Sequence, residues 1–306
     1  MSPSPKTPQY HKHLISREIL AFIIDRQARN LSPRTIEFYT DELRHFESFL
    51  TNLHIRLIYR ITPDLIRQYL IDLSATRNPG GVAAAYRSIK AWLNWYTFEL
   101  DDPSYQNPIR KIHAPKVKND PLPGVSLDQI HALLLVCPRN ANGQRDRAMI
   151  LTLLDSGLRK TEFTNLNYGD LDLKTGAVHI RSGKGNKDRT VFLGSRSRRE
   201  IIRYLRYRGD LSKNSPLWAT STSVRLTSAG LRQVIRRLSA RAGIPAPQIH
   251  DFRRTYAIEC LRNGYDLITL MRLMGHTDTK VLQRYLRIID TDLIPTSDRK
   301  SPADAL

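Results

Sequence analysis

Two short segments of the sequence place cationic side chains where they could hold or protonate an anion. Arg159 and Glu162 follow the turn sequence Ser156-Gly157, and their spacing of three residues puts them on one face of a new helix. Lys184 lies in Gly183-Lys184-Gly185-Asn186, a sequence typical of a β-hairpin turn. Taken singly, an ion pair on a helix and a lysine in a turn are common on protein surfaces.

Two later segments add groups that could also act on an anion. His250 and Arg253 are three residues apart at the start of an expected helix. His276 follows Gly275, and Tyr285 comes nine residues after His276. The chain has 13 tyrosines, so Tyr285 alone would carry no information. What distinguishes the four segments is their order: Arg and Glu, then the lysine turn, then His and Arg, then His and Tyr.

The charge of the chain indicates a polyanionic partner. Its 306 residues include 48 Lys and Arg against 29 Asp and Glu, a net charge of +19. Residues 1–50 are nearly balanced, whereas residues 181–254 contain 18 basic and four acidic side chains. Such uncompensated charges repel one another in a free protein, so we expect nucleic acid as the partner. An anionic membrane is disfavoured, because no amphipathic helix carries Trp or Phe opposite its basic residues.

Composition predicts a protein with an ordinary core. Hydrophobic residues are 41% and charged residues 25% of the chain. No apolar run is long enough to span a bilayer, and residues 1–13 lack the apolar core of a secretory signal, so we expect a cytoplasmic protein. Two cysteines, Cys137 and Cys260, are too few for a disulfide framework or a cysteine zinc site.

The pattern of apolar residues predicts a mainly α fold in two domains. Residues 14–105 read as a helical domain, with helix starts at Ser32-Pro33 and Thr62-Pro63 and a helix from Val82 to Leu100 after the break Asn78-Pro79-Gly80-Gly81. Residues 106–125 form a basic, proline-containing linker. Residues 126–290 form a mostly helical second domain, and residues 291–306 read as a disordered tail.

The second domain is expected to hold one small antiparallel sheet. Residues 177–180 and 190–193 predict its two strands, on either side of the lysine turn. Ser126 and Gln129 form a capping box at the start of the first helix. The later helices are predicted at 195–208, 227–242, 251–263, 266–273 and 279–287.

The ordered set of four segments resembles the tyrosine recombinase (phage integrase) family. The resemblance covers the whole second domain, and the first domain, with its Ser-Pro-Arg-Thr-Ile-Glu-Phe-Tyr start at Ser32, resembles the helical, SAM-like core-binding domain of the same family. Two positions depart from the family pattern. Arg254 stands where the family often has histidine, and Lys160-Thr161 replaces an apolar and a small residue. Neither change removes a group that the family uses in catalysis.

The resemblance implies how the phosphate would be held. Arg159 and Arg253 would bind the scissile phosphate, and His276 would donate a hydrogen bond to it or orient the other site residues. Glu162 would support the arginine and histidine groups. Guanidinium groups suit this task because they are permanently charged and bind phosphate oxygens in a bidentate manner. The sequence shows neither a carboxylate cluster for two metals nor a P-loop, so we expect no metal and no ATP.

The resemblance also implies which residues act as the nucleophile and transfer protons. Tyr285 would be the nucleophile, although a phenol with a pKa of about 10 is weak until cations favour the phenolate. Lys184 would protonate the leaving oxygen, and His250 would assist proton transfer and contact the phosphate. General acid catalysis of this kind typically gives ~10²–10⁴-fold.

The implied partner is double-stranded DNA with inverted-repeat core sites, bound by a homotetramer on two duplexes. Basic residues of the linker, the hairpin and the helix start are expected to contact it: Arg110, Lys111, Lys116, Lys118, Lys187, Arg189 and Arg254. The short N-terminal extension fits a simple Xer-like or mobile-element recombinase, associated with the nucleoid. The sequence does not distinguish between integration, excision, dimer resolution and transposition as the reaction of such a recombinase.

Two other function classes are weighed against a recombinase. A type IB topoisomerase uses the same chemistry, but the core-binding domain and the spacing from Gly275-His276 to Tyr285 favour a recombinase. A non-catalytic DNA-binding protein would not need all of the candidate catalytic groups, and all of them are present.

Overall fold

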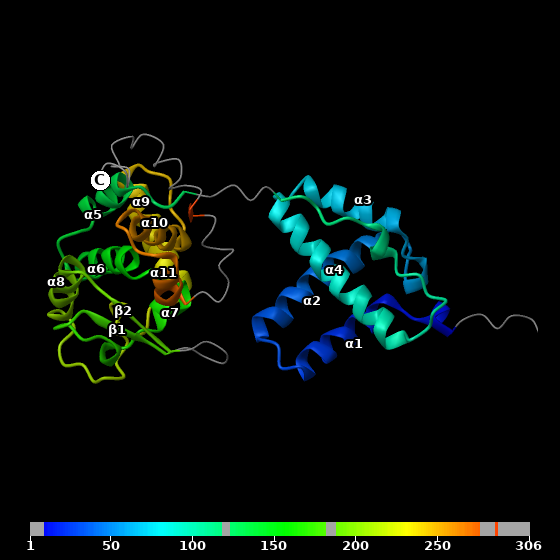
Figure 1. Cartoon of the computed structure of the whole chain (residues 1–306), viewed down its shortest axis with the longest axis horizontal. Coiled ribbons are helices and arrows are strands. Elements are labelled where there is room, and N and C mark those ends of the chain that lie inside the picture. Colours follow the sequence, from blue (N-terminus) through cyan, green and yellow to red (C-terminus); the bar gives the residue numbers. More distant parts are fainter. Residues whose placement is uncertain (1–8, 118–122, 182–187, 276–284, 287–306) are drawn as a thin grey trace, which may run out of the picture. The chain divides into compact units, whose positions relative to one another are not determined.

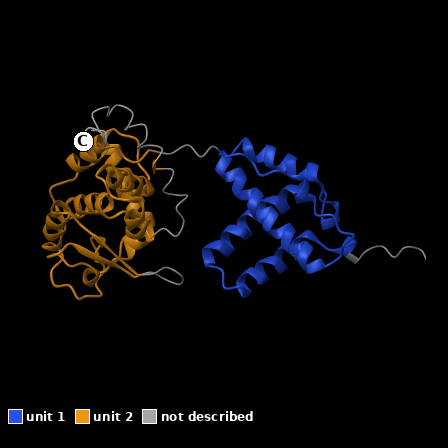
Figure 2. Cartoon of the chain, in the orientation of Figure 1, with its two compact units in different colours: residues 1–119 blue, residues 120–306 orange. Residues whose placement is uncertain are grey.

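The computed structural model describes residues 9–117, 123–181, 188–275 and 285–286 (Figure 1). The chain divides into two compact units, residues 1–119 and 120–306 (Figure 2). The boundary falls inside the predicted linker 106–125, but the first part of that linker packs on unit 1. Asn107 caps the short 3₁₀ helix Pro108–Lys111, and Ile109 is 2% exposed in the core of unit 1. An apolar residue at 109 thus extends unit 1 beyond the predicted end at 105.

Unit 1 is entirely helical within the described residues. Its α-helices are α1 (Ile15–Ala28), α2 (Pro33–Asn52), α3 (Pro63–Ser74) and α4 (Pro79–Leu100), with short 3₁₀ turns at Gln9–Lys12, Ile58–Arg60 and Pro108–Lys111. Helix α4 packs against α1, α2 and α3. The core they enclose contains Phe22, Phe46, Ile89 and Trp92, each fully buried.

Three helices of unit 1 begin with the same local device. Ser32, Thr62 and Asn78 each accept a hydrogen bond from the backbone N–H three residues later, and each is followed by proline at the first helical position. The predicted starts at Pro33 and Pro63 are confirmed. The third helix begins at Pro79, three residues before the predicted Val82, because Asn78 caps it and the two glycines continue the helix.

Unit 2 contains seven α-helices and one two-stranded sheet within the described residues. The helices are α5 (Leu127–Leu135), α6 (Ala141–Ser156), α7 (Lys160–Asn165), α8 (Ser195–Leu205), α9 (Ser228–Ala242), α10 (Ile249–Arg262) and α11 (Leu267–Met274). A 3₁₀ turn, Tyr168–Asp170, precedes the sheet. Strand β1 (Ala177–Ile180) pairs antiparallel with β2 (Arg189–Phe192). The mainly α fold with a small antiparallel sheet is confirmed, and β2 begins one residue before its predicted start.

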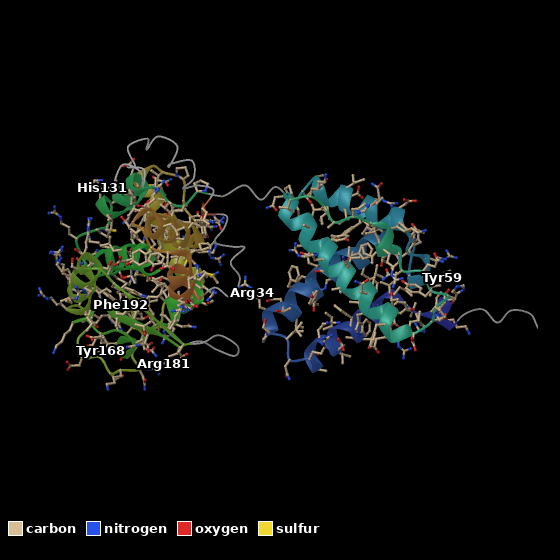
Figure 3. The ribbon with its side chains drawn as sticks, viewed as in Figure 1. Arg34, Tyr59, His131, Tyr168, Arg181 and Phe192 are labelled. Carbon is tan, nitrogen blue, oxygen red and sulfur yellow. The ribbon has the colours of Figure 1, made fainter. Side chains whose placement is uncertain are left out.

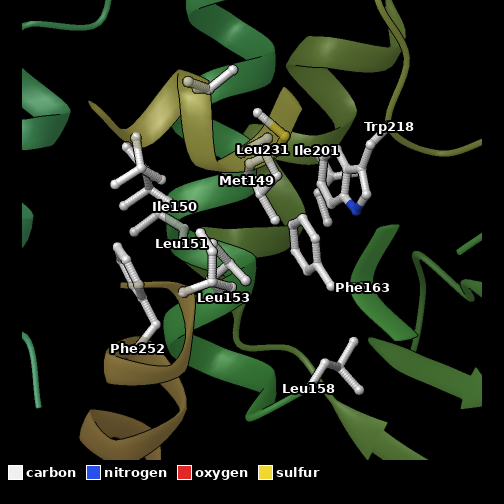
Figure 4. Packing of buried hydrophobic residues seen from close by; sticks show 14 of the residues in the cluster. Met149, Ile150, Leu151, Leu153, Leu158, Phe163, Ile201, Trp218, Leu231 and Phe252 are labelled. Carbon is white, nitrogen blue, oxygen red and sulfur yellow. The ribbon is translucent and has the colours of Figure 1, made fainter. Parts of the chain in front are cut away.

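Helix α6 is the centre of unit 2, because it packs against α8 and α10 and most of its residues are buried. Figure 4 shows Met149, Ile150 and Leu153 of α6 among side chains of the surrounding elements. Trp218 lies parallel to the ring of Phe163 at 5.0 Å and to that of Tyr204 at 5.9 Å, which joins α7 and α8 to this core. No helix within the described residues has the length and apolar character needed to cross a membrane.

Candidate active site

The turn between α6 and α7 sets the position of Arg159. Gly157 ends α6 with φ of +59°, and a Cβ there would lie 2.3 Å from the ring of Tyr256. Only glycine meets both conditions without strain. The chain then turns through Leu158, which is buried, and presents Arg159 at the start of α7.

The predicted pair of Arg159 and Glu162 forms. The backbone N–H of Arg159 donates to Glu162 Oε2 at 2.8 Å, and its Nη1 donates to Glu162 Oε1 at 2.8 Å. The side chain of Arg159 remains 38% exposed, so this guanidinium can also reach a ligand. Glu162 therefore fixes both the backbone and the side chain of Arg159.

Arg189 occupies the other side of Glu162. It donates from Nη1 to Oε1 at 3.0 Å and from Nη2 to Oε2 at 2.7 Å, and its side chain is 8% exposed. Arg189 therefore points toward Glu162 with little of its side chain exposed, and its predicted contact with DNA stays a prediction. Val191, two residues along β2, is fully buried, and strand side chains alternate between faces. The same alternation turns Arg189 inward, so the sequence held a signal for this burial.

Three arginines from three elements converge on the C-terminal end of α11. The consecutive carbonyls of Leu273, Met274 and Gly275 accept hydrogen bonds from Arg189 (2.8 Å), Arg253 (2.7 Å) and Arg159 (2.6 Å), respectively. The last carbonyls of a helix lack intrahelical partners and carry its negative dipole end, so they suit cations. This contact, which the sequence did not reveal, brings the arginines of β2, α10 and the α6–α7 turn into one cluster.

Arg253 is the most enclosed member of this cluster. It is 2% exposed, and its Nη1 donates to the carbonyl of Gly157. Burial and the nearby charge of Arg159 lower the pKa of Arg253 to about 10, so it remains protonated at neutral pH. Burial would raise the pKa of Glu162, but the hydrogen bonds from Arg189 and Arg159 outweigh it and lower the pKa to about 2. The cluster contains three guanidinium groups and one carboxylate, so its net charge is positive and it can attract an anion.

Tyr285 lies beside this cluster. It is 6% exposed and packs with Ala257, Ile258, Leu270 and Met274 of α10 and α11. Its phenol is close enough to Arg253 to act on the pKa of that guanidinium. The structure therefore brings together Arg159, Glu162, Arg253 and Tyr285, of which the first and the last are 126 residues apart in sequence.

His250 lies in the first turn of α10, three residues before Arg253. The residue is exposed, yet the surrounding protein atoms partly desolvate its ring and so lower the pKa of His250. The positive charges of Arg254 and Arg253 lower this pKa further. Arg254 is half-buried and donates to Asp251 at 2.6 Å. Its predicted contact with DNA stays a prediction.

The remaining predicted site residues fall into two groups. Lys184, His276, Lys118 and Lys187 lie outside the described residues, as does the predicted tail 291–306. Arg110, Lys111 and Lys116 belong to unit 1 and are exposed. Across the part of the chain that the structure describes, no group of three or more His, Cys, Asp or Glu side chains could hold a metal ion.

Comparison with known proteins identifies the family. Residues 125–291 match the phage integrase family, and residues 24–95 match the N-terminal SAM-like domain of phage integrases. A tyrosine recombinase XerC from Pelobacter propionicus is 30% identical to this chain, covering 94% of this chain and 96% of that protein. The XerC of Staphylococcus haemolyticus is also 30% identical, over 87% of this chain and 90% of that protein.

Solved structures agree in fold. A lambda integrase tetramer bound to a Holliday junction superposes with a TM-score of 0.75 at 12% identity, covering 91% of this chain and 82% of that one. The XerH site-specific recombinase bound to its difH substrate gives a TM-score of 0.68 at 19% identity, covering 92% and 84% of the two chains. The chain therefore belongs to the phage integrase family and is a tyrosine-type site-specific recombinase.

Proposed function

We propose that Tyr285 is the nucleophile of this recombinase. Its phenol oxygen attacks the scissile phosphate, a 3′-phosphotyrosyl bond forms, and the 5′ oxygen of the next nucleotide leaves with a proton. The ester conserves the energy of the broken linkage, so a 5′ hydroxyl can rejoin the strand without ATP. The observation that carries this proposal is the placement of Tyr285 beside Arg253 in the arginine cluster, since neighbouring cations favour the phenolate.

Arg159 and Arg253 are proposed to bind the scissile phosphate. A guanidinium has five N–H donors, and each of these two donates one N–H to each of two described partners. Three N–H groups on each side chain have no hydrogen-bond partner among the described residues, and those of Arg159 are the more accessible, because its side chain is 38% exposed. Backbone carbonyls hold both groups before DNA arrives, and Glu162 also holds Arg159, so little reorganisation is needed as charge develops on the phosphate.

The proton-transfer roles rest on the family resemblance and on one observation. The lowered pKa of His250 keeps its ring neutral at pH 7, so it can accept a proton or donate a hydrogen bond beside the arginines. Lys184 is proposed to protonate the leaving oxygen, and His276 to bind the phosphate. The chemistry proposed for these groups requires neither a metal nor ATP.

The proposed partner is duplex DNA with inverted-repeat core sites, held by a homotetramer on two duplexes in the nucleoid of the cell. The lambda integrase tetramer on a Holliday junction supports the assembly, and XerH bound to difH supports the DNA partner. The net charge of +19 provides the electrostatic attraction for this partner.

The test is to trap covalent complexes and sequence the attached DNA. Wild-type protein and Tyr285→Phe are incubated with a library of the host DNA in EDTA, denatured, and the protein-linked 3′ ends are read. We expect ends at one short repeated site for the wild type and none for Tyr285→Phe, which should still bind DNA. Adducts on Tyr285→Phe would refute the nucleophile. Relaxation by the wild type of plasmids that lack the site would instead indicate a topoisomerase.

A further inference from the structure

Helix α8 carries arginines that the active site does not use. Residues 195–208 contain six arginines and one acidic residue, Glu200. Four of the arginines are exposed and are spaced by three, four and three residues, which places them in one row along the helix. We name this row the α8 face: Arg196, Arg199, Arg203 and Arg206. The opposite side of α8 is buried against the core of unit 2.

Most of this charge has no counter-ion within the described residues. Arg203 donates to Glu200 at 2.6 Å, and Glu200 also accepts a hydrogen bond from Gln144 of α6. Across the described ranges, Arg196, Arg199 and Arg206 form no ion pair. Three unpaired guanidinium groups on one short helix repel one another, and that repulsion is relieved when an anion binds.

The α8 face lies away from the arginine cluster of the active site. Helix α6 contacts both α8 and α10, and the two helices lie on different sides of it in Figure 1. Figure 1 shows α8 at the edge of unit 2, with α7, α10 and α11 beyond α6. Nitrogen-tipped side chains project from the edge of unit 2 where α8 lies (Figure 3). Across the described residues, no hydrogen bond or ion pair joins Arg196, Arg199, Arg203 or Arg206 to the arginine cluster.

We propose that the α8 face binds the phosphate backbone of a second stretch of duplex DNA, distinct from the one in the active site. This inference rests on the proposed function in one respect, namely that the chain works on DNA. Ten residues separate Arg196 from Arg206, so the row is about 15 Å long. Each strand of a duplex carries about four phosphates over that length. Guanidinium groups bind such oxygens without reading the bases, so the contact is independent of sequence.

The composition of the face favours DNA over an acidic protein. Protein interfaces are usually built around apolar anchors enclosed at their centre. Here the large apolar side chains, Ile202 (38% exposed) and Tyr207 (60% exposed), flank the row, and its centre is charged. Bound DNA at this face would let one protomer hold a flanking or neighbouring duplex while its active site holds the core site.

The test removes the charges without touching the fold. In one variant Arg196, Arg199 and Arg206 are all changed to Gln, and in the matched control all three are changed to Lys, which keeps the charge. Arg203 stays because it pairs with Glu200. Analytical ultracentrifugation counts the fluorescent 20-base-pair random duplexes bound per chain at low salt. We expect two for wild type and the Lys variant, and one for the Gln variant, with affinity for the second duplex at least about tenfold weaker.

Two further readouts separate the possible failures. The log–log salt slope for the second duplex should be smaller by about 3 in the Gln variant, since each phosphate contact contributes about 0.9. One bound duplex on wild type, or two equally tight duplexes on the Gln variant, would overturn the proposal. Covalent adduct formation on a short core site should match wild type in both variants, and slower formation by the Gln variant alone would assign α8 to the core site. If no protein forms the adduct, the proposed function fails, and the duplex count still decides the α8 face.

Discussion

Replacing Arg189 with leucine would leave Glu162 buried with one arginine instead of two. Arg189 donates two hydrogen bonds to the carboxylate and one to the carbonyl of Leu273. Leucine retains apolar volume but supplies no donor. Arg159 remains as the partner of Glu162, through its backbone N–H and its Nη1.

The pKa of Glu162 sets the size of the effect. That pKa is about 2, against a usual value of 4.5, and each unit is about 1.4 kcal/mol, so the surroundings favour the carboxylate by about 3 kcal/mol. Arg189 supplies about half of the hydrogen bonds that produce this preference, and it also satisfies Leu273. We therefore expect Arg189→Leu to lower the free energy of unfolding by about 2 kcal/mol, which is roughly 4–8 °C in Tm for a unit of this size.

The pH dependence of this loss distinguishes the ion pair from simple packing. A carboxylate whose pKa is depressed by folding stabilises the fold above its unfolded pKa of about 4.5, and that stabilisation is lost as the pH falls toward 2. In Arg189→Leu the pKa of Glu162 moves back toward its usual value. The difference in unfolding free energy between wild type and variant should therefore shrink as the pH is lowered from 5 to 3, measured by urea denaturation. A packing defect would give the same difference at every pH.

Cleavage should suffer more than DNA binding. Without Arg189, Glu162 neutralises Arg159 alone and the end of α11 loses one tether, so we expect at least about a tenfold slower covalent attachment with affinity nearly unchanged. Arg189→Lys should recover part of the rate. The control is Arg181→Leu (Figure 3), because Arg181 is 76% exposed and pairs with Asp170 at 3.3 Å, a contact expected to be worth less than about 1 kcal/mol. Equal effects of the two leucine variants, or equal losses in affinity and rate for Arg189→Leu, would refute the reasoning.

Two further substitutions test the roles assigned to cations around the phosphate. Arg159→Ala should slow cleavage by about 10²–10³-fold and change affinity little, because 18 basic side chains in residues 181–254 share the binding; equal losses in a filter-binding and a cleavage assay would make Arg159 an ordinary backbone contact. Lys184→Ala should be rescued by a bridging 5′-phosphorothiolate, since sulfur leaves without a proton. Rescue of Lys187→Ala instead would move the general acid to Lys187.

Local signals in the sequence predicted most of the helices. Ser32-Pro33 and Thr62-Pro63 act within one helical turn. The hydroxyl accepts a hydrogen bond from a nearby backbone N–H, and the proline lacks the N–H that would have no partner at this position, so the helix start depends on no distant residue. The pairing of Arg159 with Glu162 was predictable for the same reason. The end of unit 1 was not, because Ile109 is held by a core that only the folded helices create.

The arginine cluster depends on contacts that local sequence signals do not encode. Arg159, Arg189 and Arg253 are held by three consecutive backbone carbonyls, and a carbonyl is the same group at every position of a chain. Gly275 is the residue whose type reflects this contact. It adopts φ of +62°, and a Cβ at this position would lie 3.0 Å from Nη1 of Arg189. Because one helix end fixes all three guanidinium groups, a displacement of that end would shift them together. His276 follows this end in sequence, and Tyr285 lies nine residues beyond it. The arginines proposed to bind the phosphate are therefore held by the helix end from which the chain continues toward the proposed nucleophile.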